Sequence, residues 1–329
     1  MKRSGVVLAT TGLLAIGTIA VATQVRPDLA DYESFQTAEA DSAAHGLTVT
    51  FLGVSTLLFD DGETAIMTDG FFSRPGMLSV LMGVQPDSAV IKEALDRAHV
   101  TRLAAVIPLH SHYDHAMDAP SVARQTRAQL VGSTSTRNVG LGVGLPAESI
   151  TVAVKGQPMP FGRFSVTLLE SRHVPTGFIL FPGEIKSPLT PPVPAKAYRL
   201  GEAYALVISH NDRNIVVMGS AGFSPGALKG LKADVVYLSV AALGKQSTAY
   251  RDSLWNEVVV ATGARRVIAI HWDDFFRPLS KPLQPMPRLL DNLDAAMQFL
   301  RSHSGPGAPE IQIATAFVKT DPFAGLPPP

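Results

Sequence analysis

The most informative segment of the sequence is a cluster of metal-binding residue types at positions 110–115, which reads His-Ser-His-Tyr-Asp-His. Imidazole and carboxylate groups are protein ligands of zinc and similar divalent metals. The cluster follows the apolar run 103–109, and alternate residues of an extended segment point the same way. We therefore expect His110, His112 and Asp114 to share a face while His115 turns aside. The spacing predicts a metal site, with a histidine-rich solvated loop as the weaker alternative.

Two further histidines stand at the ends of predicted strands. His173 follows the run 164–170, and His271 follows the run 266–270. Strand ends are where α/β sheets gather their site residues, so both join the candidate ligands. The chain has no cysteine, which excludes thiolate ligands, cysteine nucleophiles and disulfides. We expect structural roles for the four histidines that lack such a setting: His45, His99, His210 and His303.

The segments that must position these residues read as one domain over residues 46–329. From Gly46 the pattern predicts strands on both sides of an Asp-Gly turn at 60–62. Further strands are predicted at 103–109, 128–133, 151–154, 164–170, 203–209, 214–219, 234–240, 266–270 and 311–318. Helices are predicted at 87–98, 117–128, 250–262 and 287–303. The proline-rich stretch 181–200 predicts a long loop.

The first 45 residues are expected to lie outside that domain. Lys2 and Arg3 precede an uncharged apolar stretch at 6–22 that ends in a small-x-small sequence, which predicts a signal peptide over 1–22. The mature protein is then periplasmic or secreted. The alternative is an N-terminal anchor in the inner membrane, for which the stretch is a little short, and membrane contact would come only through this segment. Residues 23–45 predict a linker or surface arm.

The amino-acid composition excludes some classes of protein and of binding partner. The 329 residues are 46% hydrophobic and 17% charged, which excludes a disordered chain. Lys plus Arg (28) equals Asp plus Glu (28), so the sequence lacks the basic surplus of a nucleic-acid binder. Apolar residues near the candidate ligands favour an apolar-walled pocket and a small-molecule or lipid-like substrate, unless each packs in the core. They are the run 71–84, Phe178, Phe181, the loop 182–194, Trp272 and Phe275-Phe276. No oligomeric state is predicted.

These residues together make the sequence resemble the metallo-β-lactamase superfamily. The resemblance rests on the H-x-H-x-D-H motif at 110–115, on Asp69 at the end of an early strand, and on His173 and His271. It covers about residues 46–320 and implies an α/β (α+β) fold, a four-layer αβ/βα sandwich of two mixed β-sheets flanked by helices. The segments 215–223 and 261–274 are most similar to the broad branch with ascorbate-lactone hydrolases and phospholipase D-like enzymes.

The resemblance also implies which residues hold metal. His110, His112 and His173 match a first metal site, and Asp114, His115 and His271 match a second, so the expected cofactor is a pair of zinc ions, with manganese or iron as alternatives. Asp114 would also orient the attacking hydroxide, as the catalytic residue. Three residues are expected beside the ligands: Asp69, Tyr113 and Ser220.

One position departs from the family pattern. Many members carry an aspartate that bridges both metals after a strand-ending glycine, whereas Gly219 is followed here by Ser220. A neutral hydroxyl is a poor ligand, so we expect the second metal to bind more weakly. The alternative is that Ser220 only caps a helix in 224–231.

The chemistry implied by the resemblance is hydrolysis by a metal-bound hydroxide, at an ester, lactone, phosphodiester or amide bond. A second interpretation is a non-catalytic exported metal-binding protein that keeps the fold, favoured only by Ser220. A third is a diiron oxidoreductase, which usually needs more carboxylates and a flavin partner. RNA processing fits poorly with an export signal and a neutral chain.

Overall fold

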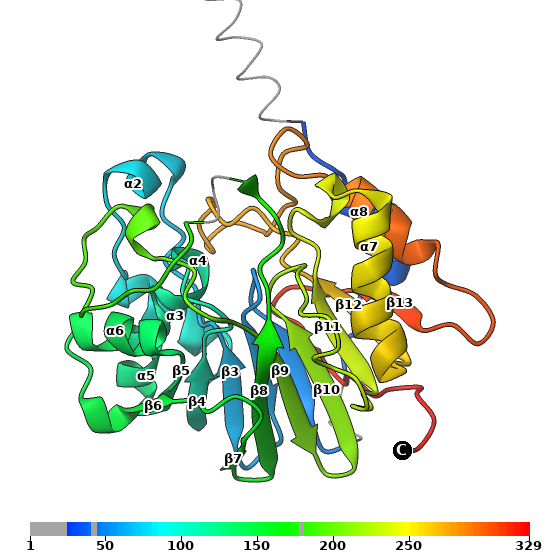
Figure 1. The fold of residues 1–329 in the computed structure, drawn as a ribbon, viewed down its shortest axis with the longest axis horizontal. Helices are drawn as coiled ribbons and strands as arrows, with labels where there is room; N and C mark the ends of the chain where they lie inside the picture. The colour runs from blue at the N-terminus through cyan, green and yellow to red at the C-terminus, as the bar shows by residue number, and fades with distance from the viewer. Residues whose placement is uncertain (1–24, 41–44, 178–180) are drawn as a thin grey trace, which may run out of the picture.

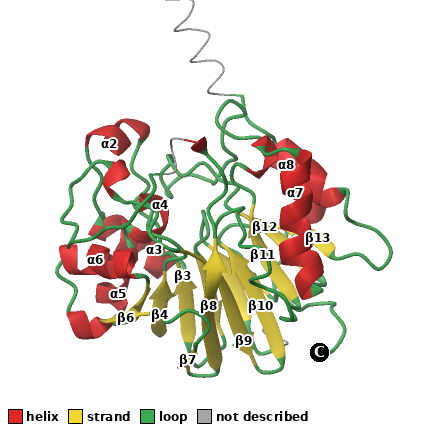
Figure 2. Cartoon of the chain, in the orientation of Figure 1, coloured by secondary structure: helices red, strands yellow, loops and turns green. Residues whose placement is uncertain are grey.

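A computed structural model describes residues 25–40, 45–177 and 181–329. Within these residues two seven-stranded sheets lie face to face, and helices cover their outer sides (Figures 1 and 2). The predicted αβ/βα sandwich is confirmed. The predicted signal peptide at 1–22 lies outside the described residues.

The first sheet is antiparallel at one edge and parallel at the other. Its order is β14-β1-β2-β3-β4-β5-β6, with parallel pairing from β3 onward. The strands are β1 (Thr48–Phe51), β2 (Leu57–Asp60), β3 (Ala65–Thr68), β4 (Leu103–Ile107), β5 (Gln129–Gly132), β6 (Ile150–Val152) and β14 (Lys319–Thr320). The helices on this side are α2 (Met77–Met82), α3 (Ser88–Arg97), α4 (Tyr113–Ala116), α5 (Ala119–Thr126) and α6 (Thr134–Gly142).

The second sheet repeats this plan. Its order is β13-β12-β11-β10-β9-β8-β7, antiparallel from β7 to β10 and parallel beyond. The strands are β7 (Pro158–Phe161), β8 (Phe164–Ser171), β9 (Ala203–His210), β10 (Arg213–Met218), β11 (Val235–Ser239), β12 (Arg266–Ile270) and β13 (Glu310–Ile313). The helices α7 (Thr248–Trp255), extended by a π-helical turn (Asn256–Val260), and α8 (Leu293–Arg301) cover it.

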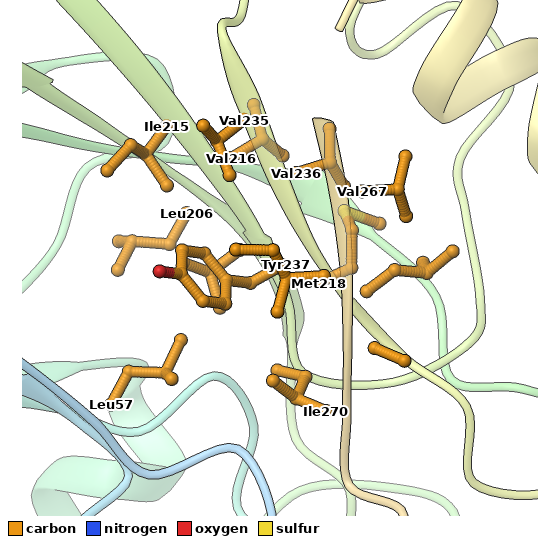
Figure 3. Packing of buried hydrophobic residues seen from close by; sticks show 14 of the residues in the cluster. Leu57, Leu206, Ile215, Val216, Met218, Val235, Val236, Tyr237, Val267 and Ile270 are labelled. Atoms are coloured by element: carbon orange, nitrogen blue, oxygen red, sulfur yellow. The ribbon is translucent and has the colours of Figure 1, made fainter. Parts of the chain in front are cut away.

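The main core fills the space between the two sheets. β11 and β12 are buried along their whole length, as expected for central parallel strands covered on both faces. Figure 3 shows their aliphatic side chains around Tyr237, with Leu57 of the first sheet opposite. Tyr237 also meets Phe59 edge to face, with ring centroids 6.0 Å apart. Both rings belong to the buried cluster between the sheets, whose close packing positions the residues at their common edge.

Several elements differ from the sequence predictions. The chain turns at Gly53 (φ +100°), which divides the first apolar run into β1 and β2. The edge strand β7 was not predicted, because its two prolines are tolerated only at a sheet edge. The helix considered for 224–231 is not formed, since this segment consists of turns. The stretch 181–200 is a long loop, as predicted, with one short 3-10 turn (Ala195–Ala197).

The segment before the first strand packs on the domain. Leu29–Phe35 forms a 3-10 helix (η1) in which Tyr32 is buried and donates to Asp294 Oδ1 at 2.5 Å. Thr37 N donates to Ile313 O at 3.0 Å. Of the two predictions for residues 23–45, a linker or a surface arm, the described part 25–40 agrees with the surface arm. Among the described residues no helix has both the length and the apolar character that a bilayer crossing requires.

Candidate metal centre

The structure brings the six candidate ligands together where β4, β8 and β12 end. They form two sets, which we call the histidine group (His110, His112 and His173) and the aspartate group (Asp114, His115 and His271). Within each group, one donor atom from each residue lies within 4.8 Å of the others. The rings of His110 and His115 are 3.8 Å apart between centroids, so the two groups adjoin. These are the sets that the resemblance implied.

The turn into helix α4 divides the motif between the two groups. His110 and His112 leave β4 in an extended segment and face each other, with His110 Nε2 3.1 Å from His112 Nδ1. The helix begins at Tyr113, so Asp114 no longer follows the extended alternation. The expectation that Asp114 shares a face with both histidines was therefore wrong, and Asp114 lies with His115 instead.

Two members of the histidine group, His110 and His173, are neutral imidazoles at pH 7. Burial, together with the neighbouring histidines, holds the pKa of His110 well below its usual value. Burial and His112 lower the pKa of His173 to about 4. His173 Nδ1 donates to Val174 O at 2.7 Å, since a carbonyl can only accept, and this leaves Nε2 as a lone-pair donor. Neutral imidazoles with a set tautomer are the form that binds a divalent ion.

The aspartate group gathers a carboxylate between two imidazoles. Asp114 Oδ2 lies 3.6 Å from Nε2 of both His115 and His271. Burial by itself would raise the pKa of Asp114, but His115 and His271 outweigh it and hold the pKa below its usual range. The pKa of His115 is raised. Burial acts to lower it, but the carboxylates of Asp69 and Asp114 outweigh the effect of burial. An anionic oxygen among imidazole nitrogens fits a divalent cation.

Asp69 determines how the His115 ring is oriented. Its Oδ2 contacts His115 Nδ1 at 2.7 Å and accepts from Ser55 Oγ at 2.6 Å, while its Oδ1 accepts from Leu109 N at 2.9 Å. The His115 ring therefore presents Nε2 to Asp114. A carboxylate behind a ligand histidine is a common arrangement in metal sites. Asp69 lies beside the site, as predicted.

Two residues of the centre have left-handed backbones. Asp69 (φ 54°) follows β3 and His271 (φ 58°) follows β12. Residues with a side chain rarely adopt this conformation, which costs of order 1–3 kcal/mol and is concentrated at functional sites. Hydrogen bonds to Ser55, Leu109 and His115 hold Asp69 in this conformation.

Ser220 and Tyr113 also lie beside the ligands. Ser220 Oγ accepts from Val174 N at 3.0 Å, so it supports the segment that carries His173 and caps no helix. The Tyr113 ring meets Phe71 and Phe275 at centroid distances of 6.0 and 6.4 Å. Burial raises the pKa of Tyr113 well above its usual value, so the phenol stays protonated and acts in packing.

A family model described as a beta-lactamase superfamily domain matches residues 64–272, more than half of the chain and the span of both donor groups. The chain belongs to the metallo-β-lactamase superfamily. A UPF0173 metal-dependent hydrolase from Heliobacterium modesticaldum is 26% identical over 121 residues, which are 37% of this chain and 44% of that relative. This chain therefore matches less than half of the length of that relative.

Solved structures share the fold at low identity. A possible metal-dependent hydrolase from Veillonella parvula is 13% identical with a TM-score of 0.50, over 83% of this chain and 98% of that one. Igni18, a metallo hydrolase from Ignicoccus hospitalis, is 13% identical with a TM-score of 0.47, over 83% and 97% of the two chains. The family model confirms the predicted superfamily, and the Veillonella parvula structure shows the shared fold alone.

The sequence analysis did not identify the residue that holds the loop after Asp69 in place. Asp118 accepts hydrogen bonds from Phe72 N, Ser73 N and Ser73 Oγ at 2.6–2.7 Å. Burial raises the pKa of Asp118 to about 6 despite these bonds. Its signal was a second carboxylate four residues after Asp114, one helical turn along the motif.

The second missed contact is a buried ion pair. Arg74 Nη2 lies 2.5 Å from Asp273 Oδ2, and both side chains are fully buried. Asp273 also accepts from Val54 N at 2.7 Å, while Asp274 pairs with Arg26 at 2.8 Å. Both aspartates therefore have structural partners. The Arg74–Asp273 pair joins the loop after β3 to the loop that carries His271.

The predicted apolar surroundings are formed in part. Phe275 meets the His271 ring at 5.7 Å and Phe181 meets the His112 ring at 6.3 Å, so two aromatic side chains touch candidate ligands. Three others are buried core residues instead: Phe71, Phe72 and Trp272. Phe178 lies outside the described residues.

The remaining histidines have other partners. His45 Nδ1 lies 2.7 Å from Asp321, and His210 Nε2 lies 3.2 Å from Asp61. His303 stacks on Trp255 at 4.2 Å, and His99 follows α3 with φ 53°. None of these four belongs to either donor group.

Proposed function

We propose that this chain is an exported metal-dependent hydrolase that binds two divalent ions and cleaves an ester, lactone, phosphodiester or amide bond. The observation that carries the proposal is the pair of adjoining donor groups, each with donor atoms within 4.8 Å of one another. The histidine group would hold one ion and the aspartate group the other. Five of the six donors are imidazoles, which favours zinc, with manganese or iron as alternatives.

The reaction needs a nucleophile and a group to orient it. When bound, the ions would acidify a water molecule and polarise a carbonyl or phosphoryl oxygen of the substrate. Asp114 is the proposed catalytic residue. Its lowered pKa keeps it a carboxylate, so it can accept a hydrogen bond from the attacking water. Its side chain is 13% exposed, which leaves it accessible to solvent. Asp69 holds the ring of the neighbouring His115 in its orientation.

The aspartate group is the weaker proposed site. Ser220 stands where many superfamily members carry a bridging aspartate, and its hydroxyl is engaged by Val174 N at 3.0 Å. A serine that accepts a backbone hydrogen bond adds no anionic ligand between the groups. We infer that the second ion is lost first during chelation.

The substrate is proposed to carry an apolar part. Phe181 and Phe275 touch ligand histidines from different loops, which supports a small-molecule or lipid-like substrate. Nucleic acid is not a proposed partner, because the formal net charge is zero. Export is supported by the apolar stretch at 6–22, and a reporter fused after residue 45 should leave the cytoplasm.

The test combines metal analysis with a hydrolysis screen over phosphodiesters, lactones, β-lactams and thioesters. We expect two ions per chain, a one-ion state after brief chelation, and turnover in one substrate class. Two equally tight ions would refute the ranking of the sites. Bound metal without turnover in any class would refute the hydrolase and favour the non-catalytic metal-binding alternative.

A further inference from the structure

Most of the large apolar side chains that the described residues leave exposed come from two segments. Helix α2 exposes Met77 (54%), Leu78 (67%), Leu81 (74%) and Met82 (69%). The second segment is the start of the arm together with the loop before α8, where Val25, Leu289 and Leu290 are exposed. Arg288 N donates to Val25 O at 2.9 Å, so these residues form one surface. We call the two together the apolar rim.

The apolar rim lies at the end of the molecule that carries the metal centre. In Figure 1, α2 and the orange segment between β12 and α8 both rise at the end toward which β8 points. His173 follows β8, and His271 begins the segment that leads to Leu289 and Leu290. A surface that met both parts of the apolar rim would therefore face the sheet edge that carries the metal centre.

Helix α2 is held firmly, so its exposure is a property of the folded protein. On one side Ser73 is bound by Asp118. On the other side Val84 N donates to Val193 O at 2.8 Å, and Val193 N returns a bond to Val84 O at 3.3 Å. Val80 packs against the buried cluster beneath the helix. The exposed side chains thus stand on a fixed projection in a stretch, 75–86, that contains no charged residue.

We propose that the apolar rim docks on a lipid bilayer, with the α2 side chains placed among the acyl chains and headgroups. A short projection with apolar side chains and no charge suits shallow insertion at a membrane interface. The described chain begins at Val25, within the rim, and the preceding residues include the uncharged apolar stretch 6–22. If that stretch is retained as an anchor, the chain that follows it enters the described domain at Val25, within the apolar rim.

The consequence concerns the source of the substrate. A docked molecule turns Asp114 and the two donor groups toward the membrane, so the substrate would be an amphiphile held in the bilayer. This last statement rests on the proposed hydrolase function, whereas the docking itself does not.

The first experiment measures insertion at a single position of the full chain. The sequence has no cysteine, so Leu81→Cys provides one attachment point for an environment-sensitive fluorophore. The matched control is Val260→Cys, which is also apolar and exposed (61%) but lies beside Asp212 of the β9–β10 turn, at the opposite end of the domain. Phosphatidylcholine vesicles with a lipid-attached quencher should quench the probe at 81 several-fold and leave the probe at 260 unchanged. Equal quenching at both positions, or none at either, would overturn the proposal.

A second variant tests the apolar contacts themselves. Leu78→Gln/Leu81→Gln should weaken vesicle partition of the full chain on the order of tenfold, because two large side chains no longer gain from leaving water. The control Val152→Gln/Val154→Gln changes two exposed apolar residues outside the rim and should not alter partition. Unchanged partition in both variants would contradict the proposal. So would shielding of the probe at 81 by rising protein concentration without lipid, which would identify a second copy of the chain as the occupant.

The same samples separate this proposal from the proposed function. Metal content and hydrolysis of a water-soluble substrate should be unchanged in the α2 variant. Absence of turnover in the unmodified chain would reject the hydrolase, whereas absence of vesicle binding would reject only the docking surface.

Discussion

Replacing Asp69 by asparagine should weaken metal binding in the aspartate group, although Asp69 belongs to neither donor group. Both carboxylate oxygens of Asp69 accept hydrogen bonds, Oδ2 at His115 Nδ1 and Ser55 Oγ, and Oδ1 at Leu109 N. An amide of the same shape has only one accepting oxygen. Asn at this position must therefore place its NH2 group against a donor in either orientation.

The two orientations fail in different ways. With the NH2 group toward His115, Nδ1 must become an acceptor, and the ring proton moves to Nε2, which faces Asp114 at 3.6 Å. A protonated Nε2 has no lone pair for a metal ion. With the NH2 group toward Leu109, two donors meet at the 2.9 Å separation now occupied by a hydrogen bond. That buried contact destabilises the start of the metal-binding segment.

The expected loss of metal affinity can be taken from other metal sites in which a carboxylate accepts a hydrogen bond from a ligand histidine. Losing the hydrogen-bond partner of a ligand histidine lowers metal affinity about 10- to 100-fold, which is about 1.4 to 2.7 kcal/mol. A buried donor without a partner costs a further ~1–3 kcal/mol in the free energy of unfolding. We therefore expect weaker metal binding in the aspartate group and a moderate loss of stability.

The assay is calorimetric titration of the metal-free protein with zinc, together with thermal unfolding. Asp61→Asn is the matched control, because Asp61 also faces a histidine, His210 at 3.2 Å, and accepts backbone bonds from Glu63 and Thr64. The control should lose stability and retain both metal affinities. Equal metal affinities in the Asp69 variant and the unmodified protein would refute the role assigned to Asp69.

Three further predictions concern the same centre. Asp114→Asn should lower kcat far more than it raises KM, because the group orients the attacking water as well as holding an ion, whereas His303→Ala should leave both constants unchanged. Similar effects of the two variants on kcat and KM would show that the active site has been assigned to the wrong residues. In the metal-free protein, the unfolding free energy should fall as pH drops from 6.5 toward 4, because unfolding lets His173 take up a proton that burial denies it. This group alone contributes roughly 3 kcal/mol over that interval, and a pH-independent stability would contradict the assignment. Gly222→Ala should displace the chain at Arg172 and weaken the histidine group, since an added Cβ would lie 2.0 Å from Arg172 O, while Gly76→Ala meets nothing within 4 Å and should be silent in metal titrations.

Local rules identified the six candidate ligands in the sequence, whereas their division into two donor sets came from the family resemblance. A strand that ends before a histidine places that histidine at the sheet edge, and His110, His173 and His271 each follow an apolar run of strand length. The layers followed from the family resemblance, which local patterns alone would not have supplied. The turn at Tyr113 was missed, because alternation describes an extended chain and the helix begins inside the motif.

The contacts that fix the centre were beyond local reasoning. Arg74 and Asp273 are 199 residues apart in the sequence, and neither neighbourhood has a pattern that indicates a buried ion pair. The bond between Ser220 and Val174 likewise joins two loops that only the finished sheet brings together. Such contacts depend on how the two sheets pack together. The periodicity of apolar residues predicts only the structure within one helix or strand.

The division of the ligands between the two sheets makes metal supply a determinant of how long the protein survives. Four donors follow β4 in the first sheet, while His173 and His271 follow β8 and β12 in the second. Each ion would therefore bridge the two halves of the sandwich and bind only when both are assembled. Binding of this kind stabilises the native state by mass action, by about 4 kcal/mol for a free ion concentration a thousand times Kd. Under metal starvation, the protein should unfold more often and be degraded faster by proteases. A shortage of the ion would therefore lower the amount of the protein as well as its activity.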